Sequence, residues 1–244
     1  MIHFFRKIHR YFYLGAVCFF FGLLFPFLYY FSRKPSRYKF LNHVRYLLGL
    51  SSSAAAGIFY FINYEEQIDW NRPYIICPNH TSNLDITAMS ISVKTNFAFM
   101  GKDELLDNFV TRLFFKTIDI PVNRDSKISS FRAFKRAQDY LKSGVSVIIF
   151  PEGKIPDDFP PTLHSFKNGA FRLAIELKIP IIPVTIKDSW KKMWDDGAKY
   201  GSRAGICHIC IHRPVDTKDI ELADADLLRD RVFGIIKTEL DNEA

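Results

Sequence analysis

From about residue 65 onward, short apolar runs alternate with segments of helical periodicity, and this alternation constrains the fold more than any other feature. The apolar runs occupy residues 74–78, 96–100, 145–150, 179–186 and 205–212. The helical patterns fall at about 84–94, 103–116, 127–142, 166–177 and 219–240. Runs that are apolar throughout are typical of parallel strands buried on both faces. The sequence therefore predicts an α/β domain over residues 65–244, with a largely parallel mixed sheet flanked by helices.

Residues 11–32 contain no charged side chain and are long enough for a helix that crosses a bilayer. Pro26 lies inside this stretch and is expected to kink it. A second uncharged stretch at 46–62 is less apolar, because its centre consists of Ser and Ala. If both stretches crossed the membrane, the basic loop between them would lie outside, against the positive-inside rule.

We therefore expect residues 1–64 to form a membrane anchor of two helices that lies partly in one leaflet. The basic residues of the connecting loop would then meet the headgroups on the cytoplasmic face of the inner (cytoplasmic) membrane. These residues are Arg33, Lys34, Arg37, Lys39 and Arg45. A single helix that spans the membrane is the alternative.

The formal net charge of +7 favours a polyanionic partner, which can be nucleic acid, an anionic membrane surface or a phosphorylated substrate. The apolar N-terminus favours the membrane, and no nucleic-acid-binding signature is present. Four cysteines form no disulfide framework, which is typical of a reduced, intracellular protein. Cys207 and Cys210 would point to opposite faces of a strand, and His208 and His212 lack a third ligand, so we predict no metal site.

The segment NHTSNLD, residues 79–85, follows the first strand of the predicted domain and precedes a helix. This order places His80 and Asp85 at the carboxyl edge of the sheet, where open α/β sheets bind ligands. A carboxylate beside a neutral imidazole fixes its tautomer and stabilises the imidazolium that forms when it takes a proton. The alternative is that Asp85 only caps the helix and His80 is an ordinary loop residue.

Arg124 follows a strand-like run and stands before a helix that Ser126 can cap. A guanidinium beside unpaired backbone N–H groups would bind a phosphate or carboxylate. The alternative is a surface arginine paired with Asp125.

The apolar run at 145–150 leads directly into Pro-Glu-Gly, which places the Glu152 carboxylate at the same sheet edge as His80. Gly153 allows a sharp turn after it. Lys102, after another strand, and Lys167, near a helix start, are further cations at this edge.

Several common catalytic motifs are absent from the sequence. It contains no G-x-S-x-G elbow, no phosphate-binding G-x-x-x-x-G-K-[ST] and no H-E-x-x-H. Serine hydrolase, P-loop and zinc protease functions are therefore disfavoured.

Four segments together resemble, in order and spacing, the four blocks of the glycerolipid acyltransferase family. They are NHTSNLD, Asn-Arg at 123–124, FPEG at 150–153 and IPIIPVTI at 179–186. The likeness is greatest to the 1-acylglycerol-3-phosphate (lysophosphatidate) acyltransferases and covers about residues 70–190. It implies the glycerol-phosphate acyltransferase type of fold.

The resemblance implies that His80, held by Asp85, deprotonates the free hydroxyl of a lysophospholipid acceptor. The hydroxyl then attacks an acyl thioester on coenzyme A or acyl carrier protein, which is a co-substrate, so no cofactor is expected. Arg124 would bind the acceptor phosphate, and Lys102 is a weaker candidate for the same role. Glu152 and Gly153 would shape the acceptor site.

One departure concerns the third block, which in the family commonly continues as Thr-Arg after Gly153. This chain has Lys154 and Ile155 there. Lys154 or Lys167 would have to replace the missing arginine, although an ammonium lacks its bidentate fork. A lyso-ornithine or lyso-glycine lipid is the alternative acceptor. A non-catalytic basic protein that binds a membrane surface or nucleic acid is supported by the charge alone.

Overall fold

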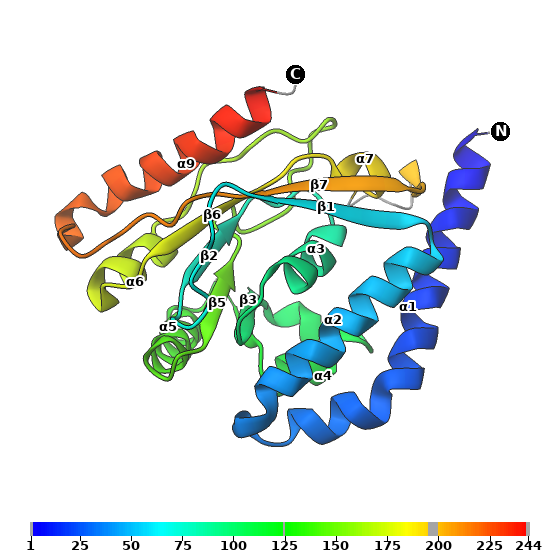
Figure 1. Cartoon of the computed structure of the whole chain (residues 1–244), viewed down its shortest axis with the longest axis horizontal. Coiled ribbons are helices and arrows are strands. Elements are labelled where there is room, and N and C mark those ends of the chain that lie inside the picture. Colours follow the sequence, from blue (N-terminus) through cyan, green and yellow to red (C-terminus); the bar gives the residue numbers. More distant parts are fainter. Residues whose placement is uncertain (1, 124, 195–199, 243–244) are drawn as a thin grey trace.

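The computed structural model of the chain contains a seven-stranded sheet in the order β1-β7-β6-β2-β5-β3-β4 (Figure 1). The structure describes residues 2–123, 125–194 and 200–242. The strands are β1 (Ile58–Tyr64), β2 (Ile75–Pro78), β3 (Phe97–Lys102), β4 (Ile120–Val122), β5 (Ser146–Ile149), β6 (Ile181–Ile186) and β7 (Gly205–Ile211). All neighbouring strands pair in parallel except β6 and β7, which are antiparallel. The predicted largely parallel mixed sheet is confirmed.

Helices cover both faces of the sheet (Figure 1). The helices are α1 (Ile2–Ser32), α2 (Tyr38–Ala55), α3 (Leu84–Ser92), α4 (Thr111–Phe115), α5 (Lys127–Lys142), α6 (Gly169–Leu177), α7 (Ser189–Lys192) and α9 (Ala225–Asp241). Apolar side chains of α5, α6 and α9 pack with Ile75, Val147 and Ile181 on one face. On the other face, α3 packs against Ile76 and Ile148. The central strands β2, β5 and β6 are therefore buried on both sides, as continuous apolar strands require.

The predicted helix at 103–116 is wrong in its middle, because the structure divides it into the 3-10 turn η2 (Asp103–Leu106) and the short helix α4. The Asn108 carboxamide oxygen accepts hydrogen bonds from the N–H groups of Val110 and Thr111. These bonds form a turn before α4, whose N-cap residue Val110 has no side-chain cap bond of its own. By contrast, α5 has the predicted bounds, and the Ser126 hydroxyl caps it by accepting from Ser129 N–H.

The apolar stretch at 46–62 does not form one helix. Helix α2 ends at Ala55, and Gly57 adopts a positive φ of 66°, a conformation that glycine favours. The chain then continues as β1, which pairs with β7 at the edge of the sheet. The aromatic and β-branched residues of β1 favour a strand. The sheet thus takes in seven residues that the sequence analysis assigned to the N-terminal segment.

The N-terminal segment does contain two helices, and α1 is the longer of them. Among the described residues, α1 alone is long and apolar enough to cross a membrane by length and composition. Only 22% of its most apolar window is buried, and Phe4, Phe12 and Phe19 are exposed along it. The helix changes direction along its length, and Pro26 lies within it (Figure 1).

Arg45 does not belong to an exposed basic loop, as the sequence analysis expected. It lies in α2, is 5% exposed, and makes a bidentate ion pair with Asp119 at 3.2 and 2.8 Å. Its guanidinium also stacks 4.2 Å from the Phe114 ring centroid, and Asp119 accepts from Phe99 N–H. This buried pair joins the N-terminal helices to the sheet. By comparison, Arg33 and Lys39 are exposed.

Replacing Arg45 by Ala leaves Asp119 buried without its cation, so we expect the free energy of unfolding to fall by about 3–5 kcal/mol. The double variant Arg45→Met/Asp119→Asn removes both charges but keeps an acceptor for Phe99 N–H, and it should recover most of that loss. Denaturant unfolding of the detergent-solubilised protein measures this, with exposed Arg132→Ala as control. A loss below about 1 kcal/mol in Arg45→Ala would contradict the assignment.

Candidate active site

Three strands of the sheet end at the same edge, and each end supplies a polar side chain to one site. His80 follows β2, Glu152 follows β5, and Ser189 follows β6. The buried Asn79 side chain ties two of these ends together, since it donates to the carbonyl of Ile186 and accepts from its N–H. The carboxyl edge of the parallel strands is where this class of sheet binds ligands.

The Asp85 carboxylate is fully buried and accepts four hydrogen bonds. Oδ2 lies 2.9 Å from His80 Nδ1 and accepts from the N–H groups of Thr81 and Ser82 at 2.7 and 2.8 Å. Oδ1 accepts from the Ser189 hydroxyl. The two N–H groups precede α3, so Asp85 organises the loop that bears His80 instead of capping the helix.

The His80 ring is held on two sides, and 16% of its side chain is exposed. Asp85 holds Nδ1, and the ring stacks on Phe150 with centroids 4.1 Å apart. A hydrogen bond between Nδ1–H and the carboxylate leaves Nε2 as the proton acceptor. The pair therefore has the geometry of an oriented general base.

Glu152 connects the turn after β5 to the His80 loop. Its buried carboxylate accepts from His80 N–H at 2.7 Å and from His164 N–H at 2.8 Å. Burial raises the pKa of Glu152 from its ordinary 4.5 to about 7, although these two hydrogen bonds favour the ionised form. Gly153 completes the turn with a φ of 81°, the sharp bend that the sequence indicated.

A cavity of ≈ 540 Å³ lies at the ends of β3, β4 and β5. It brings together five of the predicted site residues, namely Lys102, Glu152, Gly153, Lys154 and Lys167. The Lys154 ammonium contacts Asp157 at 2.5 Å, and that of Lys102 lies 4.0 Å from Glu104. Both carboxylates are largely exposed, so such pairs are weak in water.

Arg124 lies outside the described residues. Its sequence neighbours, Asn123 and Asp125, both line the cavity that contains the three lysines. The pairing of Arg124 with Asp125, or with a bound anion, therefore stays a prediction.

Sequence reasoning missed two residues that contact the His80–Asp85 pair. Ser189 is 104 positions from Asp85 along the chain, and an isolated serine gave no signal. Phe150 belongs to the FPEG segment, but its role as a stacking partner of His80 depends on the fold.

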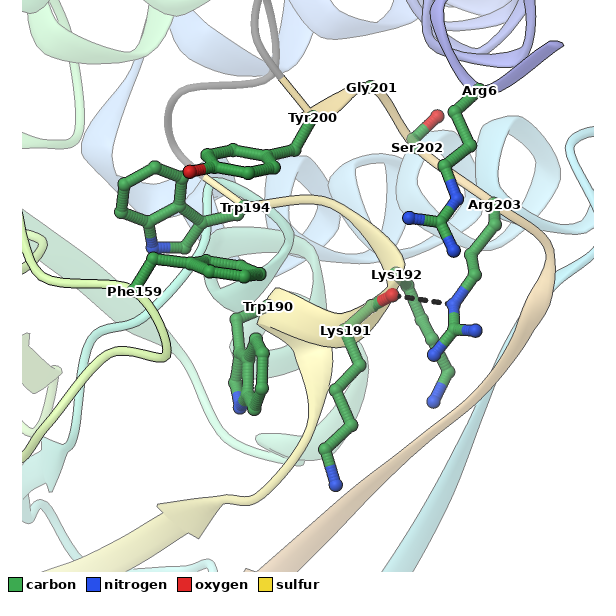
Figure 2. Close-up of a pocket in the computed structure, with 10 residues that line it drawn as sticks. All are labelled: Arg6, Phe159, Trp190, Lys191, Lys192, Trp194, Tyr200, Gly201, Ser202 and Arg203. Carbon is green, nitrogen blue, oxygen red and sulfur yellow. Dashed lines mark hydrogen bonds between the residues drawn. The ribbon is translucent and has the colours of Figure 1, made fainter. Parts of the chain in front are cut away.

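A second cavity, of ≈ 270 Å³, lies next to α7 (Figure 2). Its lining combines aromatic rings and cations from α1, from the loop after β5 and from the segment around α7. The residues are Arg6, Phe159, Trp190, Lys191, Lys192, Trp194, Tyr200, Gly201, Ser202 and Arg203. This cavity was not anticipated from the sequence.

Two side chains that could bind a metal ion together with His212 lie close to it in the structure. Glu65, Cys210 and His212 have ligand atoms within 4.8 Å of one another, so the expectation that His212 lacks further ligands is wrong. Both ring nitrogens of His212 are already hydrogen-bonded, Nδ1 to Glu65 at 2.6 Å and Nε2 to Thr185 at 2.7 Å. Cys207 and Cys210 are buried free thiols.

Several known proteins are similar to this chain. A family model described as Acyltransferase matches residues 61–187. The chloroplast 1-acyl-sn-glycerol-3-phosphate acyltransferase of Arabidopsis thaliana is 31% identical over 188 residues, which cover 74% of this chain and 50% of that protein. The human 1-acyl-sn-glycerol-3-phosphate acyltransferase alpha is 28% identical over 195 residues, 79% of this chain and 64% of the relative. The chain thus spans less than two thirds of either protein.

A solved structure shares the fold over nearly the whole chain. It is the crystal structure of the 1-acyl-sn-glycerophosphate (LPA) acyltransferase PlsC from Thermotoga maritima, with a TM-score of 0.77 and 23% sequence identity. The alignment covers 97% of both chains. The similarity includes the mostly parallel sheet and its flanking helices.

The raised pKa of Glu152 predicts a pH dependence of stability. Because its pKa of about 7 in the folded protein lies above the ordinary 4.5, folding takes up a proton between these pH values. Relative to Glu152→Gln, the wild-type protein should lose up to about 3 kcal/mol of stability as the pH rises from 4.5 to 7, and no more above that. Thermal unfolding of both proteins across this range measures the difference. Parallel curves would contradict it.

Proposed function

This chain belongs to the acyltransferase family, and we propose that it moves an acyl chain from an acyl thioester to the free hydroxyl of 1-acylglycerol-3-phosphate. The product would be phosphatidic acid, an intermediate of phospholipid biosynthesis. The donor is acyl-coenzyme A or acyl carrier protein, and the proposal requires no metal or cofactor. The observation that supports it most is the 2.9 Å contact between His80 Nδ1 and the fully buried Asp85.

In the proposed reaction, His80 Nε2 takes the proton of the acceptor hydroxyl as its oxygen attacks the thioester carbonyl carbon. The C–S bond then breaks, and the imidazolium returns the proton to the leaving thiolate. Asp85 stabilises the imidazolium and holds the ring, Phe150 stacks on the ring, and Glu152 accepts from the backbone N–H of His80. No acyl-enzyme is formed.

The acceptor phosphate is proposed to bind in the cavity lined by Lys102, Lys154 and Lys167, with Arg124 contributing from the segment between Asn123 and Asp125. Asp103, Glu104, Asp125 and Glu152 also line this cavity, so the ammonium groups would have to contact the phosphate directly, because the cavity as a whole carries no excess of positive charge. Glu152 and Gly153 form the wall of this cavity nearest to His80, since Glu152 also accepts from His80 N–H.

The proposed location is the cytoplasmic face of the inner membrane. Helix α1 is long and apolar enough to insert, and basic residues flank its C-terminal end. A lysophospholipid acceptor resides in the membrane, so an enzyme anchored there meets it without extracting it into water. We propose no nucleic-acid partner.

A second candidate acceptor is a lyso-ornithine or lyso-glycine lipid, favoured by Ile155 at the position where the family commonly has arginine. The catalytic step would be the same. Assays of the purified protein with an acyl donor and either lysophosphatidate or a lyso-aminolipid separate the two. Turnover of the aminolipid alone would exclude the leading proposal.

Replacing His80 by Ala should lower kcat/KM for acyl transfer by about 10²–10⁴-fold, because the general base is lost. Membrane association should stay unchanged, which vesicle flotation measures. The exposed His43→Ala variant is the matched control and should keep full activity. If His80→Ala retains most of its turnover, the general-base assignment is wrong.

The double variant Lys102→Ala/Lys167→Ala should raise KM for lysophosphatidate about tenfold, because two cations near its phosphate are lost. The KM for the acyl donor should not change, nor should turnover of monoacylglycerol, which lacks the phosphate. Steady-state kinetics with both acceptors tests this. An equal loss with both acceptors would show that the lysines act on folding or chemistry instead.

A further inference from the structure

A thiol, an imidazole and a carboxylate meet near one edge of the sheet. Cys210 belongs to β7, His212 follows the same strand, and Glu65 follows the edge strand β1. Cys210 and His212 are two positions apart, so their side chains point to the same face of the sheet. Strand β6 separates β7 from β2, the strand that precedes His80. The three side chains therefore form a group separate from the candidate active site.

The backbone that bears these side chains is fixed by hydrogen bonds. Strands β1 and β7 pair in parallel along their full length. Beyond the paired residues, Glu65 N–H donates to the Ile211 carbonyl at 3.0 Å, and His212 N–H donates to the Pro183 carbonyl at 3.1 Å. Side chains on paired strands keep their spacing, which a binding site requires.

The outer atoms of Glu65 and His212 are each held by a hydrogen bond. Glu65 Oε2 accepts from Arg213 N–H at 3.0 Å, and His212 Nε2 lies 2.7 Å from the hydroxyl oxygen of the buried Thr185. The remaining atoms, Glu65 Oε1, His212 Nδ1 and Cys210 Sγ, lie within 4.8 Å of one another. In metal sites the second nitrogen of a ligating histidine is usually hydrogen-bonded in this way, which orients the ring.

The spacing of the three inner atoms is close to that in a zinc site. His212 Nδ1 lies 3.9 Å from Cys210 Sγ and 2.6 Å from Glu65 Oε1. Ligand atoms around a tetrahedral zinc ion lie about 3.3–3.6 Å apart, because the bonds to zinc measure about 2.0–2.3 Å. Glu65 would thus withdraw by less than about 1 Å. Its side chain is 36% exposed, so it has room to move and leaves a path for the ion.

We propose that Cys210 Sγ, His212 Nδ1 and Glu65 Oε1 bind a zinc ion, with water as the fourth ligand. Thiolate, imidazole and carboxylate are the zinc ligands of proteins, and a thiolate disfavours magnesium and calcium. On binding, Cys210 loses its thiol proton, and the neutral His212 ring carries its proton on Nε2, next to Thr185. The two anionic ligands balance the charge of the ion.

The ion joins the edge strand β1 to β7 and takes no part in the proposed acyl transfer. Because β1 follows α2 directly, the ion fastens the N-terminal helices to the sheet at a second place, besides the Arg45–Asp119 pair. Zinc should therefore slow hydrogen exchange of the β1 amides, since opening of this strand then requires loss of the ion.

The test measures zinc and cobalt binding to the metal-free, detergent-solubilised protein. Equilibrium dialysis should find one zinc ion per chain, and bound Co²⁺ should show the absorption band of thiolate-to-cobalt charge transfer. The Cys210→Ala variant should lose this band, and its zinc affinity should fall by more than the about 10–100-fold that loss of an outer-shell partner costs. Cys207→Ala is the matched control, because Cys207 is also a buried thiol of β7 but points to the opposite face.

Two further variants test the site even if Cys210→Ala folds poorly. Thr185→Val keeps all three ligands, so the cobalt band should remain while zinc affinity falls about 10–100-fold. Glu65→Gln changes a partly exposed side chain and removes the anionic ligand. In this variant zinc should no longer slow hydrogen exchange in β1.

Three outcomes would overturn the proposal. The first is equal zinc affinity in Cys210→Ala and the wild-type protein, or bound cobalt without the thiolate band. The second is an equal loss of binding in Cys207→Ala and Cys210→Ala, because Cys207 points away from the ion. The third is loss of binding in His80→Ala, which would place the ion at the His80–Asp85 pair. Acyl transfer does not enter these measurements, so their outcome is independent of the proposed function.

Discussion

The buried carboxylate of Asp85 is the interaction on which the site depends. It accepts from an imidazole, two backbone N–H groups and a hydroxyl, and these donors come from the loop after β2 and from the start of α7. A buried charge is tolerated only when such partners surround it. The same four bonds therefore stabilise Asp85, set the ring orientation of His80 and fasten α7 to the loop that bears His80. Removing any one partner would affect all three.

The sequence alone could predict those features that follow from strand order. In a parallel sheet the carboxyl ends share one edge, so His80, Glu152 and Lys102 could be placed near one another from their positions after apolar runs. Contacts between distant side chains could not be predicted in this way. Ser189 and Asp85 are 104 residues apart, and Arg45 is 74 residues from Asp119. Neither pair has a local pattern that marks it.

The strand β1 was missed for a different reason. Its residues are as apolar as those of the preceding helix, so hydropathy joined the two into one stretch. The break is made by Gly57, whose positive φ ends α2 and turns the chain toward the sheet. Arg45 was assigned to an exposed loop because it lies in a basic segment. Nothing in that segment indicates that it is buried and paired with Asp119.

The N-terminal helix α1 contributes to the cavity next to α7. Arg6 of α1 lines the cavity at α7, and Ser202 N–H holds its carbonyl there. The helix proposed to anchor the protein in the membrane thus also forms part of the wall of this cavity. Insertion of this helix into a membrane would keep the cavity near the membrane surface.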